Sequence, residues 1–274
     1  MTFPAELDFY FGVVPVLALT LTLALALGVF AVIRRKLPPT SDPFFYQYYR
    51  WVVGPVVSLL AALKLTPNQV TLASLVLAIA SAFALGSGLM MTGLFLLVAA
   101  ATCDTMDGVL ARRLGIISEQ GAFFDSFIDR VSEAVIFAGL AYSGQGGIVT
   151  WLSVGALGAS LCVSYARARG QSLGVDISVG VMSRPARLVS VIFAIFFSGL
   201  GNVLGQPWSI GAGRMALLVL LGLVGVMSTL TAGRRAWAIM QALEARDSQR
   251  EGLAQEAPDM RAAAAAVAQT LTSP

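Results

Sequence analysis

The densest group of charges in this sequence lies between Asp104 and Asp129, in the segment DTMDGVLARRLGIISEQGAFFDSFID. The segment holds four aspartates, two arginines and one glutamate, although the chain as a whole is 57% hydrophobic and only 12% charged. Asp104 and Asp107 share one helical face, because residues three or four positions apart are neighbours on a helix. Gly121, Asp125 and Asp129 share another face by the same spacing. We therefore expect two helix ends, joined by a short loop, that bring four carboxylates into one pocket.

Carboxylates this close together need cations, because unpaired anions repel one another and lose their hydration in an apolar setting. Oxygen ligands without histidine or cysteine are the donors that suit Mg²⁺, Mn²⁺ or Ca²⁺. Four carboxylates are enough to bridge two such ions, which is the arrangement of two-metal phosphoryl transfer. Gly108 and Ala111 leave room on the same face for a ligand to approach. The alternative, helix-end charges that form surface salt bridges, does not require small residues between the aspartates.

Two absences exclude other kinds of site. The chain contains no histidine, which excludes Ser-His-Asp catalysis, His-ligated zinc and haem with a histidine axial ligand. Its two cysteines, Cys103 and Cys162, fall in apolar segments and offer neither a disulfide framework nor a redox motif. The net charge of +3 is too small to indicate a nucleic-acid partner.

Long uncharged runs predict the elements that carry this charged segment. Each is long enough for a membrane span of about 20 residues, and glycine-containing turns separate neighbouring runs. We expect an all-α integral membrane protein with an N-terminal transmembrane anchor helix at 1–36. A linker and an interfacial amphipathic helix follow at 37–64, then a six-helix transmembrane core at 65–232 and a partly disordered cytoplasmic tail at 233–274. The six core spans are expected at 70–86, 91–113, 121–142, 148–169, 186–203 and 213–232.

The basic residues predict the orientation. Most of them fall on one side of this seven-span arrangement, with Arg214 as the exception. The positive-inside rule then places the N-terminus outside, and the C-terminus and the aspartate cluster on the cytoplasmic side. A cleaved signal peptide is the alternative for the first apolar run, but Glu6 and Asp8 stand where such a peptide needs basic residues.

The order Asp-x2-Asp-Gly-x2-Ala-Arg-x8-Gly-x3-Asp-x3-Asp resembles the signature of the CDP-alcohol phosphotransferases, integral membrane enzymes of phospholipid synthesis. Its positions are met by Asp104, Asp107, Gly108, Ala111, Arg112, Gly121, Asp125 and Asp129. The resemblance covers roughly residues 45–232 and leaves the first span and the tail uncovered.

The resemblance implies a role for each of these residues. Asp104, Asp107, Asp125 and Asp129 would hold two divalent ions, Mg²⁺ or Mn²⁺, and Asp129 would also take the proton from the acceptor hydroxyl. Gly108, Ala111, Arg112 and Gly121 would line the CDP site, and Asn68 and Thr71 of the TPNQVT segment match a family pattern that faces the nucleotide. For the TPN residues, a helix cap is an alternative of equal weight. The implied partners are CDP-diacylglycerol, a small polar acceptor and the lipid bilayer of the inner membrane, and a homodimer is left open.

Four arginines, Arg167, Arg169, Arg184 and Arg187, bracket a loop between two expected spans and suit a phosphate group. The alternative is that they serve the positive-inside rule alone. The segment resembles the phosphatidylinositol phosphate synthase branch of the family, in which inositol phosphate is the acceptor. It departs from that branch at Gly170 and Gln171, where Ala-Glu is expected, and at Ser183 and Ala186, where two glutamates are missing.

Three other functions stay open at this point. Glycerol 3-phosphate or an unphosphorylated alcohol would be an alternative acceptor for the same chemistry. An ion or solute transporter also buries carboxylates, but it places them mid-membrane and often in repeated halves, and we find no internal repeat in this sequence. An inactive scaffold would be expected to have lost a motif position, and none is lost.

Overall fold

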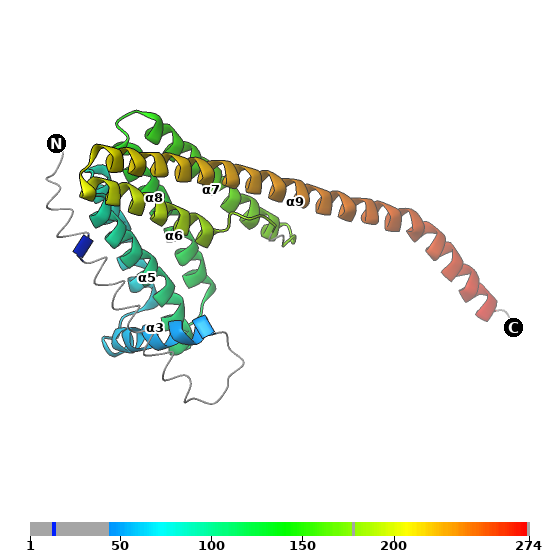
Figure 1. Ribbon diagram of the computed structural model, residues 1–274. Coiled ribbons are helices and arrows are strands. Elements are labelled where there is room, and N and C mark those ends of the chain that lie inside the picture. The colour runs from blue at the N-terminus through cyan, green and yellow to red at the C-terminus, as the bar shows by residue number, and fades with distance from the viewer. Residues whose placement is uncertain (1–12, 15–43, 177–178, 273–274) are drawn as a thin grey trace. The chain divides into compact units, whose positions relative to one another are not determined.

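The computed structural model describes residues 13–14, 44–176 and 179–272, and among these it contains helices and turns but no strand. The helices are α3 (Phe44–Ala62), α4 (Pro67–Gly86), α5 (Met90–Leu114), α6 (Glu119–Ser143), α7 (Ile148–Ser172), α8 (Arg184–Leu204) and α9 (Pro207–Thr272), shown in Figure 1. The predicted N-terminal anchor helix lies outside the described residues, apart from residues 13–14. The prediction of an all-α protein is confirmed for the part that is described.

Five of the described helices are long and apolar enough to cross a membrane. They are α4, α5, α7, α8 and the Pro207–Arg250 part of α9. The protein is therefore a multi-pass membrane protein. α6 has the same 25-residue length as α5, but Asp125, Asp129, Arg130 and Glu133 break its apolar run. α6, which carries Asp125 and Asp129, is thus a helix that its hydropathy alone does not identify as a membrane span.

The chain forms two compact units, the first made of Met1–Gly158 with Arg184–Val226, and the second of Ala159–Ser183 with Met227–Pro274. In the first unit, α4 packs on α5 and α6, and α5 also packs on α3 and α8 (Figure 1). Gly139 of α6 lies so close to α4 that a Cβ atom there would sit 2.5 Å from the carbonyl oxygen of Ala82. The hydroxyl of Ser81 in α4 donates to the carbonyl oxygen of Gly93 in α5 at 2.7 Å. Small residues therefore let α4 approach both helices that carry the aspartates.

α3 is the helix predicted to lie at the membrane surface, and it packs on α5 in the first unit. Val53 and Val57 on one side of α3 are buried in a cluster with Val70, Met106 and Leu110. The guanidinium of Arg113 at the end of α5 donates to the hydroxyl of Ser58 at 2.6 Å. α3 is thereby tied to the end of the helix that carries Asp104 and Asp107.

Arginines of α9 hold the loop after α7 in the second unit. The buried Arg235 donates to the carbonyl oxygens of Val163 at 3.2 Å and Val179 at 2.8 Å. Arg246 donates to the carbonyl oxygens of Leu173 and Gly174, at 2.8 and 3.0 Å. Val163 lies within α7, whereas Val179, Leu173 and Gly174 lie in the segment that follows it, so these bonds hold that segment against α9 within the second unit.

α9 continues as a helix to Thr272, through the tail that was expected to be partly disordered. Its end includes RAAAAAVAQ, and alanine has the highest helix propensity of all residues, which accounts for the helical backbone. A helical backbone does not exclude motion of the tail, so its mobility stays a prediction.

Candidate active site

The turn between α5 and α6 positions the aspartates. α5 ends at Leu114 and is capped by Gly115, whose φ of 68° is left-handed and whose N–H donates back into the last turn of the helix. α6 begins after Ser118, whose hydroxyl accepts from the N–H of Gly121 at 3.0 Å. Only a few residues separate the two caps, so the end of α5 lies beside the start of α6. The charged segment of the sequence thus folds back on itself, as its spacing predicted.

Three of the four aspartates form one group. Asp104 of α5 and Asp125 and Asp129 of α6 each offer a carboxylate oxygen, and these oxygens all lie within 4.8 Å of one another. Asp129 is 6% exposed. Hard divalent cations take carboxylate oxygens of this kind, so the residues present fit such an ion. Asp107 lies outside this group and is also buried, where it accepts a hydrogen bond from the Thr71 hydroxyl at 2.5 Å.

A pocket that we call the wide pocket opens on one side of the aspartates and has a cavity volume of about 390 Å³. Asp107 and Asp125 line it. All six residues expected to face the nucleotide line it as well: Asn68, Thr71, Gly108, Ala111, Arg112 and Gly121. A Cβ atom at Gly121 would lie 3.1 Å from the Ser118 hydroxyl and 3.8 Å from the Asn68 amide oxygen, so this glycine keeps the pocket open. The structure thus brings these residues together, and their contacts with a nucleotide stay a prediction.

The segment Thr66–Asn68 was left open between two roles, a helix cap and a place beside the nucleotide. Thr66 caps α4 by accepting from the N–H of Gln69, and the Gln69 side chain accepts from the N–H of Thr66, which makes a capping box. Asn68 is not part of this box and lines the wide pocket. The cap therefore fixes the helix turn from which Asn68 and Thr71 reach the site.

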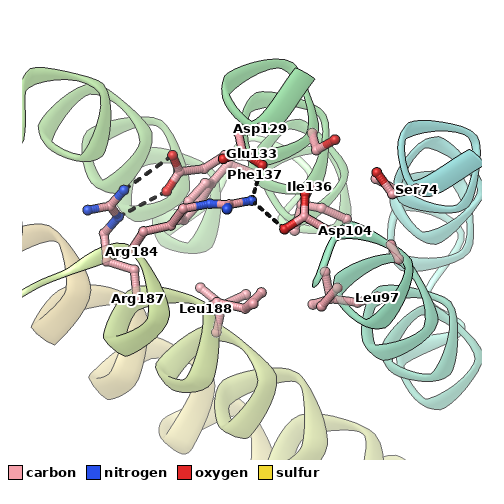
Figure 2. A pocket seen from close by; sticks show the side chains of 15 residues that line it. Ser74, Leu97, Asp104, Asp129, Glu133, Ile136, Phe137, Arg184, Arg187 and Leu188 are labelled. Atoms are coloured by element: carbon pink, nitrogen blue, oxygen red, sulfur yellow. Dashed lines mark hydrogen bonds and ion pairs between the residues drawn. The ribbon is translucent and has the colours of Figure 1, made fainter. Parts of the chain in front are cut away.

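A second pocket, the arginine pocket, is lined by Asp104 and Asp129 together with Arg184 and Arg187 of α8 (Figure 2). Its cavity volume is about 80 Å³. Ser74, Ser132 and Glu133 add polar groups, and aliphatic side chains from α5, α6 and α8 complete the wall. Asp125 of the wide pocket belongs to the same carboxylate group as Asp104 and Asp129, so the group joins the two pockets.

The four predicted arginines lie in two different settings. Arg184 pairs with Asp104 at 3.1 Å and also with Asp129. Arg187 makes a two-point contact with Glu133, its Nε and Nη2 donating to the two carboxylate oxygens at 2.9 and 3.4 Å. Arg167 and Arg169 belong to the second unit, where both are exposed on α7. The structure brings Arg184 and Arg187 to the aspartates, and the part of Arg167 and Arg169 in the site stays a prediction.

Sequence reasoning missed Glu133, Ser74 and Ser132, which line the arginine pocket. Glu133 continues the spacing of Asp125 and Asp129 by one more step of four residues. The signal for Glu133 was therefore present in the periodicity of α6, but the motif ends at Asp129. The two serines carry no signal that separates them from other serines in apolar helices.

Comparison with known proteins agrees with this geometry. A sequence model of the CDP-alcohol phosphatidyltransferase family matches residues 64–231. The phosphatidylinositol phosphate synthase of Cutibacterium acnes is 34% identical over 193 residues, which cover 68% of this chain and 93% of that protein. The archaetidylinositol phosphate synthase of Methanothermobacter thermautotrophicus is 34% identical over 187 residues, covering 67% and 91%.

Solved structures of the phosphatidylinositol phosphate synthase of Mycobacterium tuberculosis have the same fold. The structure with CDP-DAG bound matches with a TM-score of 0.60 and 27% identity, covering 68% of this chain and 92% of that chain. The complex with manganese and citrate matches with a TM-score of 0.61 and 27% identity, covering 68% and 88%. The aspartates, both pockets and all six helices from α4 to α9 fall at least in part within the matched residues 64–231. The resemblance read from the spacing of the aspartates is thereby confirmed, and the chain belongs to the CDP-alcohol phosphatidyltransferase family.

Proposed function

We propose that this protein transfers a phosphatidyl group from CDP-diacylglycerol to the hydroxyl of a phosphorylated polyol such as inositol phosphate, and releases CMP. One observation carries the proposal: a single group of carboxylates joins two pockets of different size. A reaction between a bulky nucleotide-lipid and a small polar acceptor needs such an arrangement, because both substrates must reach one phosphorus atom.

The wide pocket is the place for the CDP group, since it is the larger of the two and its small residues leave space for phosphates. Gly108 and Gly121 have no side chain to fill the pocket, and Arg112 supplies a positive charge to its lining. Thr71 holds Asp107 in place by its hydrogen bond. The solved relative with CDP-DAG bound supports a nucleotide-lipid as the donor.

Asp104, Asp107, Asp125 and Asp129 would hold two divalent ions, Mg²⁺ or Mn²⁺. Ions held there would neutralise the diphosphate and the charge that develops on the leaving oxygen. The manganese complex of the solved relative supports this assignment. Asp107, which lies apart from the other three, is tied to the wide pocket and would serve the ion on the nucleotide side.

Asp129 is the residue we assign to proton removal. It lines the arginine pocket, where the acceptor would bind, and belongs to the carboxylate group at the reacting phosphorus. The acceptor oxygen forms a bond to phosphorus, the bond from phosphorus to the CMP oxygen breaks, and the hydroxyl proton passes to Asp129. Lipid tails stay in the bilayer during this exchange.

The arginine pocket suits a small phosphorylated acceptor, because Arg184 and Arg187 place guanidinium groups beside Asp129. Arg167 and Arg169 complete the set that we assign to the acceptor phosphate. The names of the bacterial and archaeal relatives favour inositol phosphate, with glycerol 3-phosphate or an unphosphorylated alcohol as the alternative.

The setting we propose is the inner membrane, with the active site facing the cytoplasm. The six-helix core consists of α4 to α9, with α6 as the span whose charges serve the site. A further N-terminal span and the interfacial helix α3 precede the core. A homodimer stays a prediction.

The test is CMP release by purified protein with CDP-diacylglycerol, Mn²⁺ and one acceptor at a time: inositol phosphate, glycerol 3-phosphate or free inositol. We expect CMP release with a phosphorylated acceptor and none without acceptor. No CMP release with any acceptor would contradict the proposal and favour a transporter. Release with free inositol alone would support phosphatidyl transfer but overturn the assignment of the arginines to an acceptor phosphate.

A further inference from the structure

Glu133 is the acidic residue of the arginine pocket for which the proposed reaction has no role. It lies on α6, one turn beyond Asp129, and accepts two hydrogen bonds from Arg187 of α8 (Figure 2). The side chains of this pair are 14% and 3% exposed. The structure therefore shows a partly buried, two-point ion pair between α6, which carries Asp129, and α8, which carries Arg184 and Arg187.

Apolar surroundings strengthen the ion pair between Glu133 and Arg187. Ile136, Phe137 and Val191 line the same pocket, and apolar neighbours strengthen charged hydrogen bonds because little water screens them. A buried guanidinium also needs an acid, since an unpaired buried charge is strongly unfavourable. The residues next to the α8 start offer none, because Ser183 and Ala186 are uncharged. The acid that fixes Arg187 comes from α6 instead.

Arg184 and Arg187 differ in what holds them. The side chain of Arg184 is 40% exposed and pairs with Asp104 and Asp129, two residues that the proposed function assigns to the divalent ions. Arg187 pairs with Glu133, which lies outside the carboxylate group. The position of Arg187 is therefore set in part by a residue that the proposed metal site does not use.

From this we infer that Glu133 is a positioning residue for the acceptor: it fixes the guanidinium of Arg187 in the wall of the arginine pocket, where Arg187 binds the acceptor's phosphate. The inference rests on the proposed function. It assigns different roles to two arginines that look equivalent in the sequence. Arg187 is held by Glu133 and binds the acceptor phosphate, whereas Arg184 pairs with Asp104 and Asp129, which are also the proposed metal ligands.

The experiment compares Glu133→Gln, which keeps the shape of the side chain and removes its charge, with Glu119→Gln, the same change at an exposed residue in the first turn of α6. We expect Glu133→Gln to raise the KM for inositol phosphate about tenfold, the change that corresponds to roughly 1.4 kcal/mol. The KM for CDP-diacylglycerol should stay unchanged. Glu119→Gln should behave as the wild type in both.

A second pair of variants tests whether Glu133 acts through Arg187. In the Arg187→Gln background, Glu133→Gln should change the acceptor KM no further, because the group it positions is already gone. Glu133→Asp should keep part of the acceptor affinity, since it keeps the charge at a shorter reach. If Glu133→Gln does not fold, Glu133→Asp carries the comparison, with thermal unfolding recorded for every variant.

Three outcomes would overturn the inference: an unchanged acceptor KM, equal changes in the acceptor and donor KM, or effects of Glu133→Gln and Arg187→Gln that simply add. A lower melting temperature with normal acceptor affinity would assign the pair to stability alone. Binding of inositol phosphate, measured by its shift of the melting temperature without CDP-diacylglycerol, separates this inference from the proposed function. If the wild type binds inositol phosphate but releases no CMP, the proposed function fails and the loss of binding in Glu133→Gln still decides the role of Glu133.

Discussion

At the scale of single residues, Asp125 is the sharpest test of the metal site, because it lines the wide pocket and also belongs to the carboxylate group. Asp125→Asn nearly keeps the volume and removes one charge, and so does Asp104→Asn. We expect both variants to abolish transfer and to weaken Mn²⁺ binding, as measured by a Mn²⁺ titration followed by electron paramagnetic resonance. Chelation should abolish activity in the wild type. Asp247→Asn, an exposed aspartate of α9, is the control, and full activity in both site variants would contradict the metal assignment.

Asp129→Asn tests whether Asp129 acts as the general base or mainly as a metal ligand. We expect turnover to fall by about 10²–10⁴, the range for loss of a general base, while binding of CDP-diacylglycerol is largely kept. The measurements are single-turnover rates and donor affinity. A larger effect on donor affinity than on turnover would show instead that Asp129 acts mainly as a metal ligand.

Arg184→Ala and Arg167→Ala test the proposed assignment of these two arginines to the acceptor phosphate. A charged hydrogen bond to phosphate contributes about 1.5–3 kcal/mol, so each loss should raise the acceptor KM roughly ten- to a hundredfold with little change in the donor KM. The measurement is acceptor and donor kinetics with inositol phosphate and glycerol 3-phosphate. Normal acceptor affinity in both variants would overturn the assignment of these arginines to the acceptor.

The sequence predicted the aspartates and the small residues because they follow helical spacing within one short segment. Three of the four aspartates are brought together, and all six expected nucleotide residues line one pocket. The pairing of Arg187 with Glu133 was not predictable in this way. The partners are 54 positions apart, and periodicity shows which face of one helix is polar but not which helix it faces.

At the scale of elements, the contact of α4 with α6 depends on Gly139. A Cβ atom there would meet the Ala82 backbone at 2.5–2.9 Å, and backbone cannot move as a flexible side chain does. Gly139→Ala should therefore destabilise the fold by about 1–3 kcal/mol, the cost of overpacking, and should lower turnover because α6 carries Asp125 and Asp129. Thermal unfolding and activity are the measurements.

The control for this prediction is Gly155→Ala in α7, where nothing lies within 4 Å of the added atom. Alanine favours a helix over glycine by about 1 kcal/mol, so this variant should be as stable as the wild type or more stable. If Gly139→Ala behaves in the same way, α4 and α6 are not in the close contact described above.

Elements were predicted from sequence to different degrees. The apolar runs of α4, α5, α7, α8 and the first part of α9 correspond to helices, because hydropathy reports directly on burial in a bilayer. The charges of α6 interrupt that signal, and a helix was predicted there from the spacing of its aspartates together with the uncharged run that begins at Ala134. The end of α9 was expected to be partly disordered because of its low hydrophobicity; its backbone is helical, as its alanines favour, and its mobility stays a prediction.

At the scale of the whole molecule, the site is built from residues between Thr66 and Val191. Deleting residues 1–36 should therefore leave a folded, active core. The measurements are expression in the membrane fraction, thermal unfolding and CMP release. A truncated protein that folds normally but is inactive would show that the N-terminal segment shapes the site.

The placement of one carboxylate group between two pockets also predicts a kinetic scheme. Asp125 lines the wide pocket while Asp104 and Asp129 line the arginine pocket. In the proposed function, donor and acceptor would therefore occupy separate space and meet at one phosphorus atom. Such an enzyme works through a ternary complex rather than by a ping-pong cycle. Initial-rate plots for the two substrates should intersect, and labelled CMP should not exchange into CDP-diacylglycerol unless the phospholipid product is present.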